Sequence, residues 1–272
     1  MTNIETRQEL TDEFSGIKYI LSSGMRSRLL LCIYKNPKNL DDLRHDLKKP
    51  SATILHGLKE LETINLVKKV KKSYELTSNG YLLTTNMIKL IDNWYSVNKT
   101  KDFWNNHDLS DLPEEVLKNI YLLKDAECVT STTSNLSNAF NRYLKLISDA
   151  NRLKIILPIY SENHFKYLTE LLEKNKLESL DLVINKKILD SLKKHELFTE
   201  NFLQNEKVNV KCSNRDLKLF LTYSDDFMSL SLFFNDGHYD DSQILIAKDE
   251  NAVKWASSLI NYYKWRETWK DI

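Results

Sequence analysis

Apolar positions between residues 51 and 77 change their period partway along the stretch. The first group recurs at spacings of three and four and comprises Ile54, Leu58, Leu61, Ile64 and Leu66. Such spacing places these side chains on one buried face of a helix. The period then becomes that of short strands on either side of a lysine-rich tip. The pattern predicts an amphipathic helix that runs into a hairpin, which is the arrangement of a winged helix-turn-helix.

Further helical periods surround this stretch, at residues 14–21, 26–34, 40–47 and 80–95. Together with the helix predicted at 51–64, they give a three-helix core with an N-terminal extension and a following helix. Asn39 and Ser51 are residue types that cap helix N-termini, so each is expected to cap the helix that it opens. The run Lys48-Lys49-Pro50 forms the short break that a helix-turn-helix requires between its two helices.

The second half of the chain alternates between strand and helix patterns. Strands are predicted at 127–132, 153–159 and 179–185, and helices at 135–150, 162–175 and 186–195. This alternation predicts βαβ units with a parallel sheet. Further strands at 207–212, 217–223, 228–234 and 243–247 are separated by short turns and are suited to extend the sheet antiparallel, before a helix from Glu250.

Between the two halves, residues 96–112 lose apolar periodicity and end just before Pro113, a residue suited to the first turn of a helix. We therefore predict a two-domain chain of the α+β/α/β class. Its parts are a winged helix-turn-helix domain with its following helix at 1–96, a linker at 97–112, and an α/β domain with a mixed sheet at 113–272.

Composition is that of a soluble globular protein, with 42% hydrophobic and 28% charged residues among 272. No apolar run approaches the roughly 20 residues needed to span a bilayer, and the first residues lack signal-peptide features. A cytoplasmic protein without membrane contact is expected. Residues 1–90 carry a net charge of +5 and the remainder −4, so the basic excess accompanies the predicted helix and hairpin.

The three cysteines, Cys32, Cys128 and Cys212, are far apart and lie in apolar or strand-like sequence. That distribution favours buried thiols over disulfides or metal ligands. No metal and no cofactor is therefore expected.

Side chains opposite the buried face of the helix at 51–64 are candidates to contact DNA bases or phosphates. The first turn presents backbone N–H groups and hydroxyls, apolar side chains suit thymine methyls, and basic ones reach acceptors. The alternative is that they are merely solvated. The candidates are Ser51, Ala52, Thr53, Leu55, His56 and Lys59.

The hairpin tip is the second candidate surface, because lysines there would lie along the DNA backbone and make affinity strongly salt-dependent. Its members are Lys68, Lys69, Lys71 and Lys72, and the alternative is a hairpin whose lysines only aid solubility. Arg26 and Arg28, at the start of an earlier helix, are further candidates for phosphate contact.

An enzymatic interpretation has little support. His164 and Lys166 have the H-x-K spacing of phospholipase D-type motifs, but the aspartate expected five residues after the lysine is replaced by Leu171. The chain also lacks a phosphate-binding glycine loop and a G-x-S-x-G motif. We therefore expect no catalytic residues and no enzymatic activity.

A ligand pocket is a more plausible use of the second domain, because open α/β sheets bind ligands at the carboxyl ends of their strands. Pro158 and Tyr160 follow one predicted strand, and Asp236, His238 and Tyr239 follow another in a polar loop. These five residues are the candidates for binding a small-molecule effector. The alternative is an ordinary solvated turn with tyrosines packed at the domain edge.

Both halves also carry a family resemblance. The segments LSSGMRSRLLLCIYKNPKNLDDLRHDLKKPSATILHGLKELETINLVKK and DDFMSLSLFFNDGHYDDSQILIAKDENAVKWASSLINYYK resemble archaeal winged helix-turn-helix regulators whose C-terminal half is the domain named after a methanogenesis regulatory protein. The first segment is also similar to the wider arsenic-repressor-like group. Metal-sensing members of that group carry paired cysteines near the recognition helix, and this chain has none there.

The resemblance implies a transcription regulator in which a DNA-binding module is joined to a sensor or dimerisation domain. We expect its partners to be double-stranded DNA, a second copy of the chain, since homodimers read paired half-sites, and an unidentified small-molecule effector. The alternative is a winged helix that contacts protein, without sequence-specific DNA binding.

Overall fold

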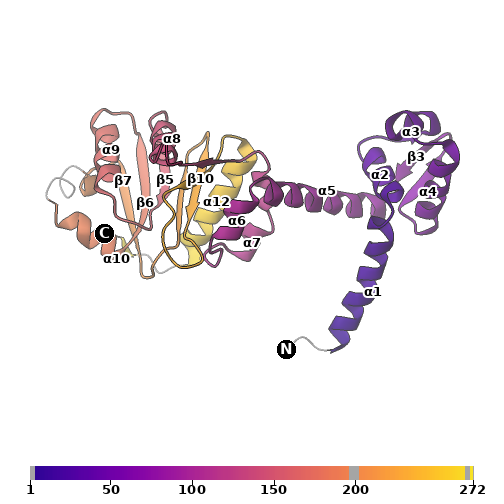
Figure 1. The fold of residues 1–272 in the computed structure, drawn as a ribbon, viewed down its shortest axis with the longest axis horizontal. Coiled ribbons are helices and arrows are strands. Elements are labelled where there is room, and N and C mark those ends of the chain that lie inside the picture. The colour runs from indigo at the N-terminus through magenta and orange to yellow at the C-terminus, as the bar shows by residue number, and fades with distance from the viewer. Residues whose placement is uncertain (1–3, 196–201, 267–269, 272) are drawn as a thin grey trace. The chain divides into compact units, whose positions relative to one another are not determined.

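The computed structural model describes residues 4–195, 202–266 and 270–271. It divides into two compact units, residues 1–91 and 92–272. Each unit is treated separately below, and Figure 1 gives the element labels.

The N-terminal unit combines helices with a small three-stranded sheet (Figure 1). The sheet is antiparallel with the order β1-β3-β2, and β2 and β3 form the predicted hairpin. This is the arrangement of a winged helix-turn-helix. Its elements are α1 (Ile4–Leu21), α2 (Gly24–Ile33), β1 (Lys38–Asn39), α3 (Leu40–Leu47), α4 (Ser51–Thr63), β2 (Val67–Val70), β3 (Ser73–Leu76) and the start of α5 (Ser78–Lys99).

The core of this unit is formed by the apolar faces of α2, α3 and α4. Ile54, Leu58 and Leu61 of α4 are buried, as their spacing predicts. Ile64 is 38% exposed, contrary to the prediction, because α4 ends at Thr63 and the helical period no longer directs the next residue inward.

One of the two predicted caps is confirmed. The Asn39 side chain accepts a hydrogen bond from the Asp42 N–H and forms a capping box at the start of α3. Ser51, however, is not the cap of α4: Pro50 occupies that position and makes no side-chain capping bond. Proline accepts the extended backbone required before a helix, so Ser51 shifts into the first helical turn.

Gly80 permits the close approach of α5 to the start of the hairpin. A Cβ atom at this position would lie 1.9 Å from the Leu66 carbonyl oxygen. The Leu66 oxygen also accepts a hydrogen bond from the Thr77 N–H, and the Thr77 hydroxyl accepts one from the Gly80 N–H. The absence of a side chain at Gly80 therefore allows α5 to begin directly after the wing.

The C-terminal unit is built on a mixed eight-stranded sheet of order β11-β7-β6-β5-β8-β9-β10-β4. Only β5, β6 and β7 are parallel neighbours, and the other pairs are antiparallel. The strands are β4 (Glu127–Thr130), β5 (Arg152–Ile156), β6 (Ser179–Asn185), β7 (Val208–Ser213), β8 (Leu219–Tyr223), β9 (Met228–Leu232), β10 (Gln243–Ala247) and β11 (Lys270–Asp271).

The predicted mixed sheet is confirmed, but the first predicted parallel strand is not. β4 lies at the sheet edge and pairs antiparallel with β10, with Val129 opposite Ile244. An alternation of strand and helix patterns indicates that a helix can connect two parallel strands. It does not show which strand of the sheet each predicted strand will pair with.

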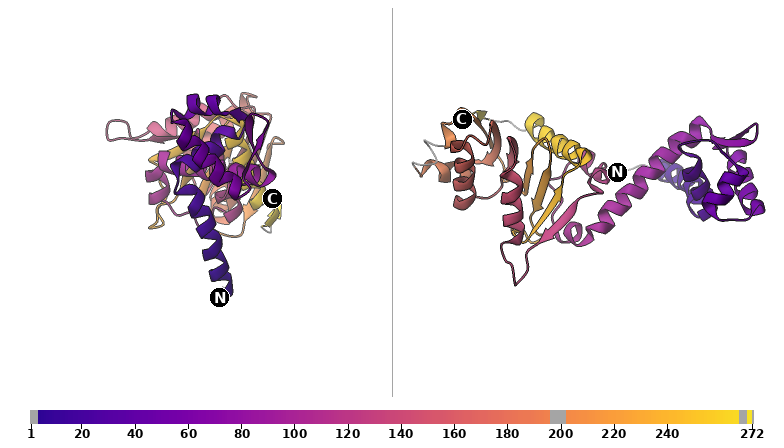
Figure 2. Two further views of the ribbon diagram at one scale, coloured as in Figure 1. Left: turned by 90° about the vertical axis from the view of Figure 1, so that its right-hand side faces the viewer. Right: turned by 90° about the horizontal axis from the view of Figure 1, so that it is seen from above.

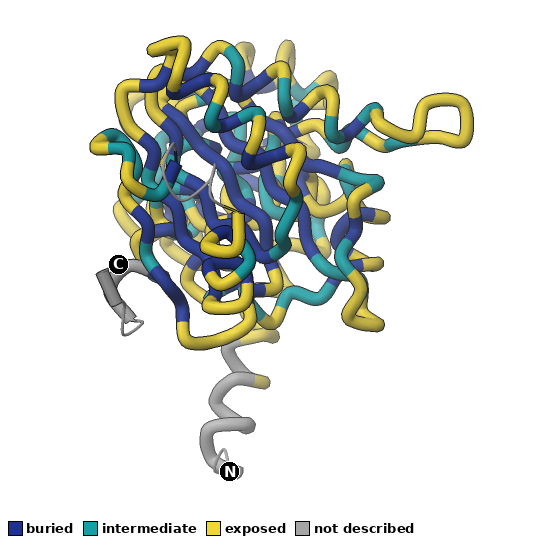
Figure 3. The backbone as a smooth tube through the Cα atoms, turned by 90° about the vertical axis from the view of Figure 1, so that its left-hand side faces the viewer, coloured by how far each residue is buried: buried dark blue, intermediate teal, exposed yellow. Residues whose placement is uncertain are grey.

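Helices cover both faces of this sheet (Figures 1 and 2). Successive strand residues point to opposite faces, so Ile155 packs in one core and Ile156 in the other. Figure 3 shows the buried strands beneath helices whose outer turns are exposed. One face carries α8 (Asn138–Ile147), α9 (Glu162–Glu173) and α10 (Lys186–Lys193), and the other carries α6 (Lys101–Asn106), α7 (Glu114–Leu117), η1 (Ile120–Leu123) and α12 (Glu250–Arg266).

The segment predicted as a linker, 97–112, is folded. It contains the end of α5 and all of α6, and Phe103 and Trp104 are buried in the core beneath α12. The loss of apolar periodicity reflects a helix of only six residues, which is too short to establish a period.

Candidate nucleic-acid interface and effector cavity

The outer face of α4 presents the predicted group of DNA-contacting residues. Ser51 is half-buried in the first turn, and the other five are exposed. Leu55 is 41% exposed despite being apolar, and His56 lies 3.7 Å from the Glu60 carboxylate. The structure therefore places this group together at the surface: Ser51, Ala52, Thr53, Leu55, His56 and Lys59.

The four lysines of the hairpin are all exposed. Lys68 Nζ lies 2.9 Å from Glu75 Oε1, and Lys69 Nζ lies 5.6 Å from the centroid of the Tyr74 ring. Lys71 and Lys72, which form the turn, have no ion-pair partner among the described residues.

The backbone at Lys71 has a φ of 56°, in the left-handed region. Two-residue hairpin turns favour glycine or asparagine at such a position, because a Cβ atom disfavours this conformation. The turn therefore holds a lysine at a position where local geometry favours glycine or asparagine.

Arg26 and Arg28 have different environments. The Arg26 side chain is 10% exposed, its Nη1 lies 3.0 Å from Glu60 Oε1, and its guanidinium lies over the Tyr19 ring. The Arg26 side chain joins α1, α2 and α4. It is therefore buried, although it was predicted as a candidate phosphate contact. Arg28 is exposed, as a phosphate contact requires.

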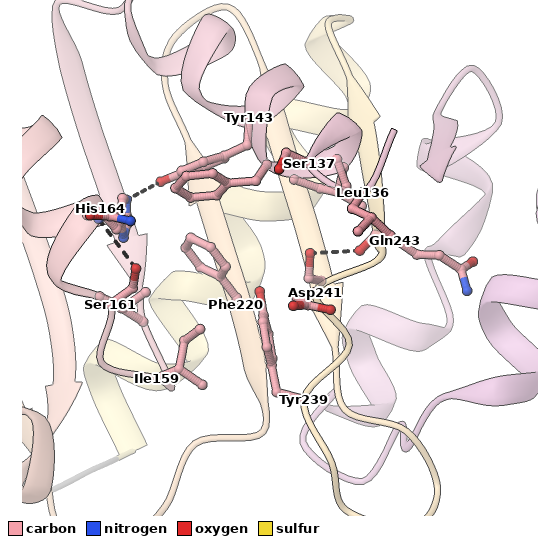
Figure 4. A pocket seen from close by; sticks show the side chains of 16 residues that line it. Leu136, Ser137, Tyr143, Ile159, Ser161, His164, Phe220, Tyr239, Asp241 and Gln243 are labelled. Atoms are coloured by element: carbon pink, nitrogen blue, oxygen red, sulfur yellow. Dashed lines mark hydrogen bonds between the residues drawn. The ribbon is translucent and has the colours of Figure 1, made fainter. Parts of the chain in front are cut away.

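A cavity of about 340 Å³ lies on the α8 and α9 side of the sheet in the C-terminal unit (Figure 4). Its walls are mostly aromatic and aliphatic, and include Phe140, Tyr143, Ile159, Phe220 and Tyr239. Volumes of about 300–1,000 Å³ are typical of small-molecule sites. The cavity adjoins the carboxyl end of β5, which is the edge at which open α/β sheets bind ligands.

A buried polar group forms part of this cavity lining. The Tyr143 hydroxyl lies 2.8 Å from His164 Nε2 and 3.3 Å from Thr222 Oγ1. Burial raises the pKa of Tyr143 and lowers the pKa of His164 to about 3, so both side chains are neutral at pH 7. Lys166 is exposed and paired with Glu162, so the H-x-K motif does not place its two side chains in one site.

The five predicted effector residues do not converge on one cavity. Tyr239 lines the 340 Å³ cavity, and burial raises its pKa. Pro158 and Tyr160 line a different hollow, beside α10. Asp236 and His238 form an exposed pair with 3.1 Å between Oδ1 and Nδ1.

The sequence analysis did not identify most of the residues that line the cavity. Tyr143 lies on α8, far along the chain from Phe220 and Ser231, which face each other on the neighbouring strands β8 and β9. Each fits the ordinary apolar or alternating pattern of its element, so only the sheet order brings them together. His164 was considered only as part of a catalytic motif.

A second buried polar cluster anchors the loop that precedes β10. His107 Nε2 lies 3.0 Å from Asp240 Oδ2, and both side chains have at most 1% exposure. His107 Nδ1 contacts the Phe103 carbonyl, and its ring stacks on Phe234. Asp240 Oδ1 accepts hydrogen bonds from the Ser242 N–H and hydroxyl, at 2.8 and 2.6 Å.

Two kinds of feature are absent from the described ranges. No group of three or more histidine, cysteine or acidic side chains in them is arranged to hold a metal ion. No helix in the described part of the chain is both long and apolar enough to cross a membrane.

Two solved structures align along much of the chain, but with low structural similarity. TrmBL2, an archaeal chromatin protein whose structure shows a novel mode of DNA binding, is 12% identical, with 88% of this chain and 90% of that chain covered and a TM-score of 0.41. An O-methyltransferase family protein from Burkholderia thailandensis is 12% identical, with coverages of 79% and 65% and a TM-score of 0.27. Neither similarity is high enough to support an argument about this chain.

Sequence comparison is more informative. Residues 14–94 match the N-terminal domain, and residues 136–266 the middle domain, of the methanogenesis regulatory protein FilR1. FilR1 of Methanothrix harundinacea (strain 6Ac) is 28% identical over 260 residues, which cover 94% of this chain. The matched region spans 58% of that relative's length. With both domains present in the same order along most of its length, the chain belongs to the family of the methanogenesis regulatory protein FilR1.

Proposed function

We propose that the protein is a DNA-binding transcription regulator. The observation that carries the proposal is the surface of the N-terminal unit, where a helix with an exposed polar first half is followed by a wing with four exposed lysines. Membership of a family named for a regulatory protein supports the same function. No catalytic step is included in the proposal.

In this proposal, α4 enters the major groove with its N-terminal residues toward the base edges. Ala52 and Leu55 offer apolar contact to thymine methyl groups, and His56 and Lys59 offer hydrogen bonds to base or phosphate acceptors. The wing lysines neutralise backbone phosphates, which raises affinity for any sequence and fixes the position of α4. Arg28 remains a candidate phosphate contact, whereas buried Arg26 is better explained as a structural residue.

The proposal is tested by titrating the full-length protein onto fragments of its own upstream DNA and onto scrambled fragments, across a range of salt. We expect selective retention of one natural fragment. Four phosphate contacts lower the affinity of one protomer by roughly 100-fold between 50 and 200 mM salt, and eight contacts lower that of a dimer by roughly 10,000-fold. Equal or absent binding to all fragments would contradict the proposal and favour a winged helix that contacts protein.

We also propose that the regulator acts as a homodimer through α5. Leu82, Leu90 and Trp94 on this helix are 63%, 57% and 70% exposed, and Ile91 is 45% exposed. Apolar side chains concentrated on one long helix favour burial against another copy. Two copies would also allow two α4 helices to read paired half-sites.

Replacing Leu90 and Trp94 together with lysine is expected to make the protein monomeric. Each large apolar side chain stabilises an interface by about 1.5–3 kcal/mol when fully buried, and the variant removes two from each protomer. Light scattering after size-exclusion chromatography, over a range of concentrations, measures the mass. Asn141→Lys with Asn251→Lys adds the same charge at exposed asparagines of α8 and α12, away from α5, and should leave the dimer intact.

The third part of the proposal assigns an effector to the C-terminal unit. An effector changes DNA affinity only to the extent that it binds the DNA-competent and incompetent states differently. The cavity of about 340 Å³ beside β5 is the candidate for its site; of the five residues predicted from the sequence, Tyr239 lines it and the other four do not.

A further inference from the structure

We propose that the cavity beside β5 binds an uncharged, largely apolar small molecule that carries a hydrogen-bonding group. The inference deepens the proposed function, because it assigns a chemical class to the effector. It rests on the walls, the charges and the polar groups of the cavity, which are taken in turn.

The walls favour a flat apolar body. Phe140, Tyr143, Phe220 and Tyr239 line the cavity together with aliphatic side chains. The Tyr143 and Phe220 rings meet edge to face, with 5.2 Å between centroids, so the wall that they form is closely packed. Figure 4 shows these rings around the same space. A ligand that binds against aromatic and aliphatic side chains gains binding free energy mainly by burying its apolar groups.

The charges exclude an anionic ligand. No lysine or arginine is among the described residues that line the cavity, and His164 is neutral at pH 7. The one ionised side chain is Asp241, at the exposed rim. A phosphate, sulfonate or carboxylate would therefore enter without a cationic partner and close to a carboxylate, at a substantial desolvation cost.

A cation is also disfavoured. Ser137 and Ser161, the N-cap residues of α8 and α9, line the cavity, so both helices begin at its wall (Figure 4). Each helix N-terminus has a partial positive charge of roughly half a unit, which opposes the single negative charge of Asp241. The local field is nearly balanced, and a balanced field suits an uncharged ligand.

Polar groups give the ligand one orientation. His164 and Tyr143 line the cavity and are joined by a hydrogen bond of 2.8 Å, and Ser231 lines it beside Tyr239. Asn163 and Gln243 complete the polar part of the lining. A few polar groups in an apolar cavity orient a ligand by pairing with its polar atoms. One hydroxyl, amide or carbonyl group on an apolar molecule would satisfy this requirement.

The test compares two dyes that share a ring skeleton and differ in charge. N-phenyl-1-naphthylamine is neutral, and 8-anilino-1-naphthalenesulfonate adds a sulfonate. With the full-length protein at pH 7, we expect saturable fluorescence enhancement by the neutral dye with one site per chain, and at least 10-fold weaker binding of the sulfonate. Equal or tighter binding of the sulfonate would overturn the charge argument, as would tighter binding of cationic 1-naphthylmethylamine.

Matched variants locate the site. Ser137→Trp places a large ring at the cavity wall, whereas Ser134→Trp changes an exposed serine of the same loop that does not line it. We expect the first to weaken the neutral dye at least 10-fold and the second to leave it unchanged. Ile159→Trp obstructs another wall, and Leu122→Trp is its control on the opposite face of the sheet.

Unchanged dye affinity in both Ser137→Trp and Ile159→Trp would refute this location, provided that circular dichroism shows folded proteins. The dye measurements contain no DNA, so they are independent of the DNA-binding test. Dye binding at the cavity without selective DNA retention would contradict the regulator proposal alone, and the reverse result would contradict the ligand proposal alone.

Discussion

Replacing the four wing lysines with glutamine should lower DNA affinity by up to roughly 1,000-fold at 0.1 M salt, if each lysine neutralises one phosphate. Glutamine keeps a polar side chain of similar reach but releases no counterions. The slope of log affinity against log salt should also decrease, by about 0.9 for each lost contact. Fluorescence anisotropy with a labelled fragment, repeated at several salt concentrations, measures both quantities. The variant carries Lys68→Gln, Lys69→Gln, Lys71→Gln and Lys72→Gln.

The four lysines are not expected to contribute equally. Lys68 is paired with Glu75 and must exchange that carboxylate for a phosphate. Lys71 and Lys72, at the turn, have no ion pair to break among the described residues. Single substitutions at the turn should therefore have larger effects than Lys68→Gln.

A control for net charge uses the C-terminal unit. Four exposed lysines there are paired with glutamates one helical turn away, and their replacement removes the same total charge. This variant should retain DNA affinity within a few-fold. A loss equal to that of the wing variant would mean that overall charge, and not the wing, determines binding. The control residues are Lys118, Lys166, Lys174 and Lys254.

Lys71→Gly separates the DNA contact from hairpin stability. Glycine adopts the φ of 56° at this position without the strain imposed by a Cβ atom, so hairpin stability should be maintained or rise by about 1 kcal/mol. DNA affinity should nevertheless fall. Because the hairpin is not weakened, loss of the fold could not explain such a fall. An unchanged affinity would mean that the lysine is not a phosphate contact.

The N-terminal unit could be predicted in detail because its elements follow from local pattern. The spacing of Ile54, Leu58 and Leu61 predicts the buried face of α4, and the residues opposite are exposed as a consequence. The burial of individual arginines on α2 could not be predicted in the same way. Arg26 is buried because Tyr19 and Glu60, from two other helices, surround it, and no local pattern contains that information.

The C-terminal cavity shows the same limit on a larger scale. Strand and helix positions were predictable, but the placement of β8 beside β5 determines which side chains share a space. His164 acquires its neutral state from burial by Tyr143, Phe165 and Phe220, which belong to three different elements. Spacing along the chain therefore shows His164 only as part of an incomplete H-x-K motif, whereas the sheet order places it in the wall of a cavity.

Asp240→Asn should destabilise the C-terminal unit by about 1–3 kcal/mol, the range expected when a buried polar group loses its hydrogen-bond partner. Both His107 ring nitrogens face acceptor oxygens, one from Asp240 and one from the Phe103 carbonyl. One Asp240 oxygen contacts His107 Nε2 and the other accepts from the Ser242 N–H and hydroxyl, and an asparagine would replace one of these oxygens with an NH₂ donor. Urea unfolding followed by tryptophan fluorescence measures the loss, because Trp104 and Trp255 are buried in this unit.

The same loop supplies the matched control. Asp236 and His238 form a histidine–aspartate pair with nearly the same separation as the buried one, 3.1 Å against 3.0 Å, but both side chains are exposed. Solvent screens such a pair, so Asp236→Asn should change stability little. His107→Gln combined with Asp240→Asn replaces the buried pair with two amides that can pair with each other and should recover part of the lost stability. Equal losses of unfolding free energy in Asp236→Asn and Asp240→Asn would show that burial does not determine the strength of this contact. The position of the loop before β10 would then depend on the packing of Phe234 and Tyr239.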